Sequence, residues 1–382
     1  MSIHDVLVTG GAGYIGSHLV DALVDRGYRV TVLDNLEPQV HRSGTWPSYV
    51  NPKATYVRGD VRDRGVFEPL VLASQAVVHF GAAVSVGQSM YQIDRYVDVN
   101  TRGTALLLDI LVNTTHRVEK VIVASSIGVY GEGAYRCATH GAVAPTIRPE
   151  PQLAARDWEQ KCPVCGAPAE SIPTPEDKAL YRDNIYSMTK YHQEEMVLLI
   201  GKTYGIPAVA PRFFNVYGPR QSLSNPYAGV AAIWLSRLMN GKQPVVFEDG
   251  GQLRDFVSIH DVVDCLVLML EKPGADYLPV NVGSGQTVTI LEIAELLARL
   301  LGSPIEPQVT NNGRKFDIRH NTADITRART ALGFKPRVSL EQGFRELIEW
   351  ARTTPDRAED FFDRALQELQ DKGLLVQGSS TP

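Results

Sequence analysis

The chain has 382 residues, of which 44% are hydrophobic and 21% are charged, and its formal net charge is −5. This length suits two lobes that share a core. No basic block marks a nucleic-acid surface, no apolar run is long enough to span a bilayer, and the glycines and prolines follow no repeat. We therefore expect a globular protein that binds neither nucleic acid nor membranes.

The first five residues lack the charged and apolar regions of a secretory signal. We therefore expect a cytoplasmic protein, and a reducing compartment disfavours structural disulfides among its four cysteines. One of these, Cys265, lies in an apolar helical segment and is expected to be a core residue.

Strand and helix patterns alternate over the first 124 residues. The strands are short apolar runs, as in a sheet that is covered on both faces, and residues with helical spacing lie between them. This alternation indicates an α/β fold with a doubly wound parallel sheet. The predicted strands are 5–9, 29–34, 54–60, 76–80 and 120–124, and the predicted helices are 14–26 and about 101–113.

The pattern breaks near residue 134 and resumes near residue 185. Residues 134–180 hold seven prolines, three cysteines and no long periodicity, which indicates an insertion at the C-terminal edge of the sheet. The mixed elements beyond residue 218 predict a smaller mixed α/β lobe. The predicted helices are 185–204, 228–240, 260–271, 289–301 and a charged amphipathic helix from about 354, the predicted strands are 208–214 and 244–247, and residues 377–382 are expected to fray.

A glycine-rich segment, residues 11–16, has the pattern G-x-G-x-x-G between a strand and a helix. Gly10 and Gly13 let backbone N–H groups approach a pyrophosphate, and Gly16 lets helix and strand pack closely. Asp34 ends the second strand, where a carboxylate binds ribose hydroxyls and repels a 2′-phosphate. The segment predicts a Rossmann-type NAD site, the alternative being an ordinary glycine-rich turn. Asp60, after the third strand, is either an acceptor for the adenine amino group or a surface acid.

Tyr186 and Lys190 lie one turn apart on one face of a predicted helix. A tyrosine with a pKa of about 10 is a poor base at neutral pH, but a neighbouring ammonium stabilises the phenolate. The pair could therefore act as a general acid/base on a sugar hydroxyl. Ser126 follows the fifth strand, where doubly wound sheets place their sites, and could share the substrate hydrogen bond.

Four motifs, residues 9–16, 125–131, 186–190 and 212–220, together resemble the extended short-chain dehydrogenase/reductase family. More narrowly they resemble its NAD-dependent nucleotide-sugar epimerases and dehydratases, over the chain to about residue 350. The resemblance implies bound NAD, a nucleotide-diphosphate sugar as substrate, and a homodimer formed by the helices near 101–113 and 185–204. It implies the catalytic residues Ser126, Tyr186 and Lys190; a cofactor site of Gly10, Gly13, Tyr14, Ile15, Gly16, Asp34, Asn35, Asp60, Val61, Phe80, Ala82, Ala83, Asn100, Tyr186 and Lys190; and a substrate site of Ser126, Asn215, Arg254 and Arg319.

The same resemblance divides the chain into three parts. We expect an NAD-binding Rossmann domain over 1–215 with the insertion 134–180, a substrate-binding lobe over 216–352, and a C-terminal helix and tail over 353–382. A segment near 275–285 is expected to return to the main domain. The predicted fold is thus a Rossmann-type doubly wound parallel sheet with a smaller mixed α/β substrate-binding lobe.

The residues after Ser126 bear on the reaction. Dehydratases of this family carry an Asp-Glu pair there and decarboxylases a nearby Glu, whereas this chain has Ile127 and Gly128. The sequence therefore predicts a 4-epimerase, unless an acid such as Glu132 or a residue of the insertion replaces the pair. Residues 33–41, residues 87–91 and the insertion resemble the members that convert dTDP-L-rhamnose to dTDP-6-deoxy-L-talose. UDP-glucose or UDP-glucuronate 4-epimerisation and 4-ketosugar reduction or dehydration are the alternatives.

The insertion contains two closely spaced pairs of metal-ligand residues. Cys137 and His140 form one pair, and Cys162 and Cys165 the other, 21 residues further on. Two such pairs can complete a tetrahedral site, and four protein ligands would make a zinc ion structural. The alternatives are reduced thiols in a loop or a redox pair formed by Cys162 and Cys165.

Overall fold

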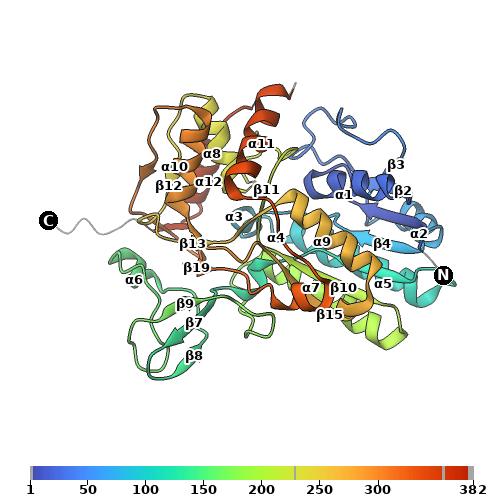
Figure 1. Ribbon diagram of the computed structural model, residues 1–382, viewed down its shortest axis with the longest axis horizontal. Coiled ribbons are helices and arrows are strands. Elements are labelled where there is room, and N and C mark those ends of the chain that lie inside the picture. The colour runs from blue at the N-terminus through green and yellow to red at the C-terminus, as the bar shows by residue number, and fades with distance from the viewer. Residues whose placement is uncertain (1–2, 228, 355–357, 377–382) are drawn as a thin grey trace.

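The structure is a computed structural model that describes residues 3–227, 229–354 and 358–376. Its centre is a parallel sheet in the order β15-β10-β5-β4-β1-β2-β3, with β6 also paired to β10 (Figure 1). The predicted α/β class is therefore confirmed. The strands of this sheet are β1 (Asp5–Thr9), β2 (Arg29–Asp34), β3 (Thr55–Arg58), β4 (Ala76–His79), β5 (Lys120–Val123), β6 (Ser125–Ser126), β10 (Ala208–Phe213) and β15 (Leu278–Val282).

Helices cover both faces of the sheet. Successive residues of β1 pack on opposite sides: Val6 and Val8 contribute to one apolar core and Leu7 to the other. This two-sided burial explains why the strands are continuous apolar runs. The covering helices are α1 (Tyr14–Asp25) and α9 (Ile259–Glu271) on one face, and α2 (Arg64–Leu72), α5 (Gly103–Asn113) and α7 (Ile185–Tyr204) on the other.

A smaller lobe has a core of its own, centred on the buried side chains of Trp234 and Phe344. The Trp234 indole donates a hydrogen bond to the carbonyl of Val245 at 3.0 Å, which satisfies its buried N–H group. The lobe comprises α8 (Val230–Met239), α10 (Ile290–Leu301), α11 (Leu340–Thr353), α12 (Phe362–Asp371) and the short strands β11 (Asn215–Tyr217), β12 (Val245–Val246), β13 (Leu253–Arg254), β14 (Phe256–Ser258), β16 (Val288–Thr289), β17 (Gln308–Val309), β18 (Gly313–Arg314), β19 (His320–Asn321) and β20 (Leu375–Val376).

The chain passes between the two lobes more than once. After α9 and the 3₁₀ turn η3 (Pro273–Ala275), strand β15 returns to the edge of the main sheet and pairs with β10. The π-helical turn η4 (Ala328–Leu332) then packs Leu332 into the core beneath α9. Both segments therefore belong to the core of the main sheet, whereas the smaller lobe keeps a separate core.

The insertion is more ordered than its sequence predicts. It forms an antiparallel sheet in the order β8-β7-β9, from β7 (Ala134–Cys137), β8 (Gly141–Val143) and β9 (Glu170–Ile172), with the short helix α6 (Glu150–Ala154). Figure 1 shows this sheet projecting from the body of the molecule, below the smaller lobe. Local propensity gave no sign of these strands because they are short, and because β8 and β9 contain no buried residue.

Several predicted boundaries change. The predicted helix at 101–113 begins as the short helix α4 (Ile93–Tyr96) and a π-helical turn, η1 (Val97–Arg102). The helix expected from 354 begins at Phe362, and α11 before it was not predicted. The predicted fraying of 377–382 lies outside the described residues. Among the described residues, no helix is both long enough and apolar enough to cross a membrane.

Gly16 offers a test of how closely the glycine-rich turn packs. A Cβ atom there would lie 2.3 Å from the carbonyl oxygen of Gly10 and 2.7 Å from the Gly11 Cα, and these backbone atoms cannot rotate away. We expect Gly16→Ala to lower the free energy of unfolding by about 1–3 kcal/mol. Gly65→Ala is the control, because its Cβ would meet only Asp63 Oδ1, at 3.3 Å. Urea unfolding of both variants measures the difference, and equal stabilities would contradict the packing argument.

Candidate active site

The glycine-rich turn lies where β1, β2 and β4 end side by side. Gly10 has a φ of 68°, and a Cβ there would lie 2.9 Å from the backbone of Phe80 and Gly81, so the turn packs directly on the loop after β4. The backbone N–H of Ala12 donates to Asp34 Oδ2 at 3.0 Å, which ties the turn to the end of β2. The ends of β1, β2 and β4, which are far apart in the chain, thus form one continuous edge of the sheet.

Asp34 is oriented by two backbone hydrogen bonds. Each carboxylate oxygen accepts one N–H group, from Ala12 and from Leu36 at 2.9 Å. Because a carboxylate has about four lone-pair positions, acceptor capacity remains for the ribose hydroxyls of a dinucleotide. The site therefore fits NAD at this point, as the sequence predicts.

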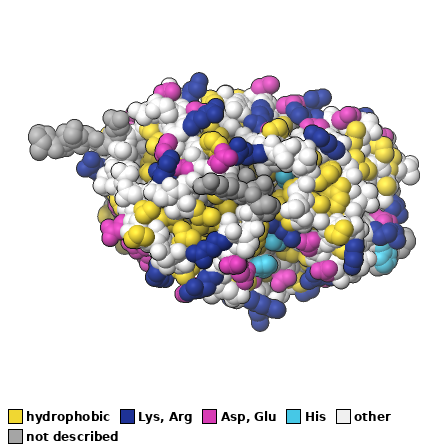
Figure 2. Space-filling view, turned by 90° about the horizontal axis from the view of Figure 1, so that it is seen from above, with side chains coloured by type: hydrophobic (Ala, Val, Ile, Leu, Met, Phe, Trp, Pro, Cys, Tyr) yellow, Lys and Arg dark blue, Asp and Glu magenta, His cyan; other side chains and the backbone are white. Residues whose placement is uncertain are grey.

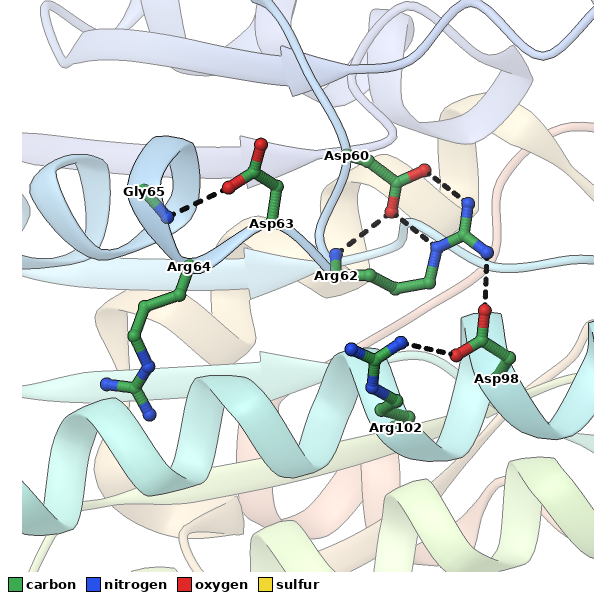
Figure 3. Close-up of a pocket in the computed structure, with 7 residues that line it drawn as sticks. All are labelled: Asp60, Arg62, Asp63, Arg64, Gly65, Asp98 and Arg102. Carbon is green, nitrogen blue, oxygen red and sulfur yellow. Dashed lines mark hydrogen bonds and ion pairs between the residues drawn. The ribbon is translucent and has the colours of Figure 1, made fainter.

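Asp60 is held by neighbouring side chains (Figure 3). Its carboxylate accepts hydrogen bonds from the Arg62 guanidinium at 2.7 and 2.8 Å, from the Arg62 backbone at 2.9 Å and from Asn35 at 3.1 Å. The Arg62 guanidinium lowers the pKa of Asp60 to about 2, so the carboxylate is ionised. These four donors use its lone pairs, and the predicted bond to an adenine amino group would require one of them to leave. Val61 beside it is buried and packs against Gly81 and Gly103.

Asn100 supports the loop that lines the predicted cofactor site. Its side chain is fully buried, accepts a hydrogen bond from the Ala83 N–H at 2.7 Å, and donates to the Ala83 carbonyl and to Thr189 at 3.0 Å. The amide is thereby committed to protein partners. In this structure Asn100 positions Ala82 and Ala83 and connects their loop to α7.

Ser126, Tyr186 and Lys190 lie together at the carboxyl edge of the sheet. Ser126 ends β6, and Tyr186 is in the first turn of α7, whose N-cap Asn184 accepts a hydrogen bond from Ser187 at 2.9 Å. The Ser126 hydroxyl lowers the pKa of the Tyr186 phenol, so the two side chains lie close together. One turn later, Lys190 Nζ donates to the carbonyl of Ala124 at 3.2 Å. The sequence predicted these three residues separately, and the fold brings them together.

Burial dominates the titration of this group in the free chain. It raises the pKa of Tyr186 above its usual value, against a smaller lowering by the Ser126 hydrogen bond. It also lowers the pKa of Lys190 to about 7. The sequence argument that Lys190 lowers the pKa of Tyr186 therefore does not describe the free chain, in which the phenol stays protonated at neutral pH.

An ion pair beneath the site was not predicted. Arg212 on β10 and Glu194 on α7 are both buried, and their side chains join through two hydrogen bonds of 2.5 and 3.0 Å. Glu194 also accepts from Ser125 at 2.5 Å, and Arg212 donates to the Tyr130 hydroxyl at 2.9 Å. Glu194 lies one turn after Lys190, so the helix face that carries Tyr186 and Lys190 was the available signal.

The predicted substrate residues differ in how free they are. Asn215 Oδ1 is buried and has no hydrogen-bond partner among the described residues, which fits a group that awaits a ligand. The Arg254 guanidinium donates to the carbonyls of Leu253, Ile318 and Arg319 at 2.7–2.9 Å, so it is oriented by backbone.

Arg319 is surrounded by carboxylates. Its guanidinium donates to Glu159 at 2.6 Å, to Asp249 at 2.7 Å and to Glu248 at 3.0 Å, and only 2% of its side chain is exposed. These three carboxylates neutralise the positive charge of Arg319, which would be needed to bind a diphosphate. This arrangement does not fit the predicted phosphate contact, and in this structure Arg319 instead joins the smaller lobe to the insertion.

Glu132 is equally committed to the protein. Its fully buried carboxylate accepts hydrogen bonds from the Tyr135 hydroxyl, the Gln160 amide and the backbone N–H groups of Arg319 and His320, at 2.8–2.9 Å. With its lone pairs used, Glu132 cannot also serve as a substrate acid in this conformation. The sequence left open whether Glu132 replaces the missing dehydratase acid, and its hydrogen bonds in this structure exclude it from that role.

The four predicted metal ligands converge at the tip of the insertion. The ligand atoms of Cys137, His140, Cys162 and Cys165 all lie within 4.8 Å of one another. No disulfide joins these cysteines.

The comparisons with known proteins agree with this geometry. A model of the NAD dependent epimerase/dehydratase family matches residues 6–149 and 162–283. The chain belongs to this family and is an NAD-dependent enzyme of it. The match is interrupted at 150–161, within the insertion.

Individual relatives are epimerases. A dTDP-L-rhamnose 4-epimerase of Burkholderia thailandensis is 37% identical over 359 residues, which cover 92% of this chain and 96% of the relative. The solved UDP-glucose 4-epimerase of Thermotoga maritima with UDP-glucose has a TM-score of 0.76 at 30% identity and covers 92% and 100% of the two chains. The UDP-glucuronic acid 4-epimerase of Bacillus cereus, solved with UDP-glucuronic acid and NAD, has a TM-score of 0.73 at 25% identity and covers 91% and 98%.

The role of Glu132 can be tested by Glu132→Gln. An amide cannot accept all four hydrogen bonds and places its own N–H₂ group against buried donors, so we expect the free energy of unfolding to fall by about 2–4 kcal/mol. The control is Glu170→Gln on β9, where the side chain is exposed. Urea unfolding of both variants measures the effect, and a stability loss shared by the control would count against the hydrogen-bond argument.

Proposed function

We propose that this protein is a nucleotide-sugar 4-epimerase that keeps its NAD bound through the reaction. The observation that carries the proposal is the cluster of Ser126, Tyr186 and Lys190 beside the glycine-rich turn, with no acid at positions 127 and 128. Such a site can take a proton and a hydride from one carbon, but it lacks the further acid that elimination of water requires.

Tyr186, Ser126 and Lys190 have different roles in the proposed reaction. NAD, when bound, supplies an acceptor for the hydride that leaves C4 of the sugar, and its positively charged nicotinamide ring favours the Tyr186 phenolate. Tyr186 removes the proton of the C4 hydroxyl, and Ser126 hydrogen-bonds the same oxygen. Lys190 has one carbonyl partner, so its remaining N–H groups can bind the nicotinamide ribose.

Epimerisation follows if the 4-keto sugar turns before the hydride returns. The sugar then presents its other face, Tyr186 gives the proton back to the oxygen, and neither substrate nor cofactor changes in net oxidation state. The diphosphate anchors the substrate through this turn, and the side-chain N–H₂ group of Asn215 can donate to it. We assign this anchoring to Asn215 and Arg254 rather than to Arg319.

The proposed substrate is dTDP-L-rhamnose, with dTDP-6-deoxy-L-talose as product. Its support is the 37% identical relative from Burkholderia thailandensis, whose match extends over nearly the whole of both chains. UDP-glucose and UDP-glucuronic acid are the alternatives, because solved structures with those ligands have the same fold.

We infer in addition that two copies of the chain associate through α5 and α7. Leu199 on α7 is 64% exposed, and Ile93 on α4 and Val97 on η1 are 50% and 43% exposed. Exposed aliphatic side chains on neighbouring helices favour an interface. A monomeric mass by light scattering would contradict this inference.

The function is tested by incubating the purified protein, without added cofactor, with dTDP-L-rhamnose, UDP-glucose and UDP-glucuronic acid. We expect inversion at C4 of dTDP-L-rhamnose, observed by NMR, because the bound cofactor is regenerated in each cycle. Inversion of a UDP-sugar alone would overturn the substrate assignment. If no sugar changes until NADH is added and a 4-keto sugar is then reduced, the protein is a reductase.

Tyr186→Phe tests the catalytic assignment in the same assay. Loss of the hydroxyl removes the acid/base, and we expect turnover to fall by about 10²–10⁴-fold while NAD still binds. Tyr204→Phe is the matched control, since Tyr204 is on the same helix and is 53% exposed. NMR turnover and the NAD content of the purified variant provide the two measurements, and a fully active Tyr186→Phe variant would refute the assignment.

A further inference from the structure

Three thiols and one imidazole converge at the tip of the insertion, away from the proposed active site. The Cys137 sulfur lies 3.6 Å from His140 Nδ1 and 3.8 Å from the Cys165 sulfur, and the Cys162 sulfur lies 3.6 Å from the same His140 nitrogen. One ligand atom from each of the four residues lies within 4.8 Å of every other. Two ligand pairs that are separated by 21 residues in the sequence thus meet at one point.

The distances match the edges of a tetrahedral zinc site. Zinc–sulfur bonds of about 2.3 Å and zinc–nitrogen bonds of about 2.0–2.1 Å, set at tetrahedral angles, place two sulfurs about 3.8 Å apart and a sulfur and a nitrogen about 3.6 Å apart. The separations of 3.8 and 3.6 Å in this structure have these values. A disulfide would bring two sulfurs to about 2.05 Å, so the geometry does not describe a cystine.

The two ligand turns have the same local shape. Each ligand pair spans four residues and is followed by a glycine in the left-handed region, Gly141 with a φ of 69° and Gly166 with a φ of 72°.

The tip of the insertion has little else to hold it together. Its apolar cluster consists of Leu153, Trp158 and Val376, which lie toward the smaller lobe, whereas Val164 between the two cysteines is 69% exposed. Of its three short strands only β7 is largely buried, and so small a sheet is marginal without a further constraint. A metal ion would supply that constraint.

We propose that Cys137, His140, Cys162 and Cys165 bind one Zn²⁺ ion in a closed tetrahedral site. Four protein ligands leave no open position, so the ion is structural. It joins the β7–β8 turn to the segment that carries Glu159, whose carboxylate accepts hydrogen bonds from Arg319 and, at 2.9 Å, from His320. The zinc site thereby holds the insertion against the smaller lobe.

The site is tested on the untagged full-length chain. We expect elemental analysis to find one zinc ion per chain, and Co²⁺ exchanged into the protein to show the visible absorption of a tetrahedral cobalt thiolate. Cys165→Ser removes an exposed ligand and should lose the metal, whereas Val164→Ser changes the neighbouring exposed residue and should keep it.

Hydrogen exchange reports the structural role independently of activity. In Cys165→Ser, we expect faster amide exchange in residues 134–143 and 159–172 and unchanged exchange in β1 of the main sheet. No metal in the unmodified chain, thiols of Cys137, Cys162 and Cys165 that all react freely in its native state, or iron in place of zinc would each overturn the proposal. Retention of zinc by Cys165→Ser, or exchange unchanged after metal loss, would also overturn it. None of these results depends on the proposed epimerase activity.

Discussion

The ion pair between Arg212 and Glu194 is the interaction on which the proposed active site depends. It joins the sheet to α7, which carries Tyr186 and Lys190, and its remaining hydrogen bonds fix Ser125 and the Tyr130 hydroxyl. Both side chains are almost fully buried, so removal of either partner would leave an uncompensated charge, at a cost of about 3–5 kcal/mol. The position of the catalytic pair is thus secured by charges that never meet the substrate.

Burial of the titratable groups at the site lowers the stability of the protein but favours the proposed reaction. Lys190 is held where its pKa falls to about 7, and burial keeps the Tyr186 phenol protonated in the free chain. The pKa of a buried group responds strongly to the charge of a bound cofactor, because the surrounding dielectric is low. The site is therefore organised for a state in which cofactor and substrate are present.

A second network lies beyond the active site and unites the insertion with the smaller lobe. Arg148 and Glu248 form a fully buried ion pair, Glu248 also accepts from Arg319, and Glu132 accepts two backbone N–H groups of β19 and the residue before it. On the face shown in Figure 2, by contrast, acidic and basic side chains are interspersed at the surface. The strongest electrostatic interactions are thus internal and join segments that are distant in sequence.

The sequence by itself determined the elements whose signals are local. Helix 185–204 was predicted with the bounds that the structure shows, because Asn184 caps one end and Gly205, in the left-handed region, ends the other. Spacing within one or two elements was also enough to predict the glycine-rich turn, Asp34 and the Tyr186–Lys190 pair. The two ligand pairs, Cys137 with His140 and Cys162 with Cys165, were visible for the same reason, and their spacing left a shared metal site open beside free thiols and a redox pair.

Only the tertiary structure decided what each charged side chain meets. Arg319 was predicted to bind phosphate, yet its partners Glu159, Asp249 and Glu248 lie about 70 to 160 residues away and neutralise it. Glu132 was a possible acid, but four donors occupy its carboxylate, and three of them come from segments 28 to 188 residues away. Spacing reveals the face of a helix or the end of a strand, but burial and charge pairing depend on contacts between distant segments, which no local pattern records.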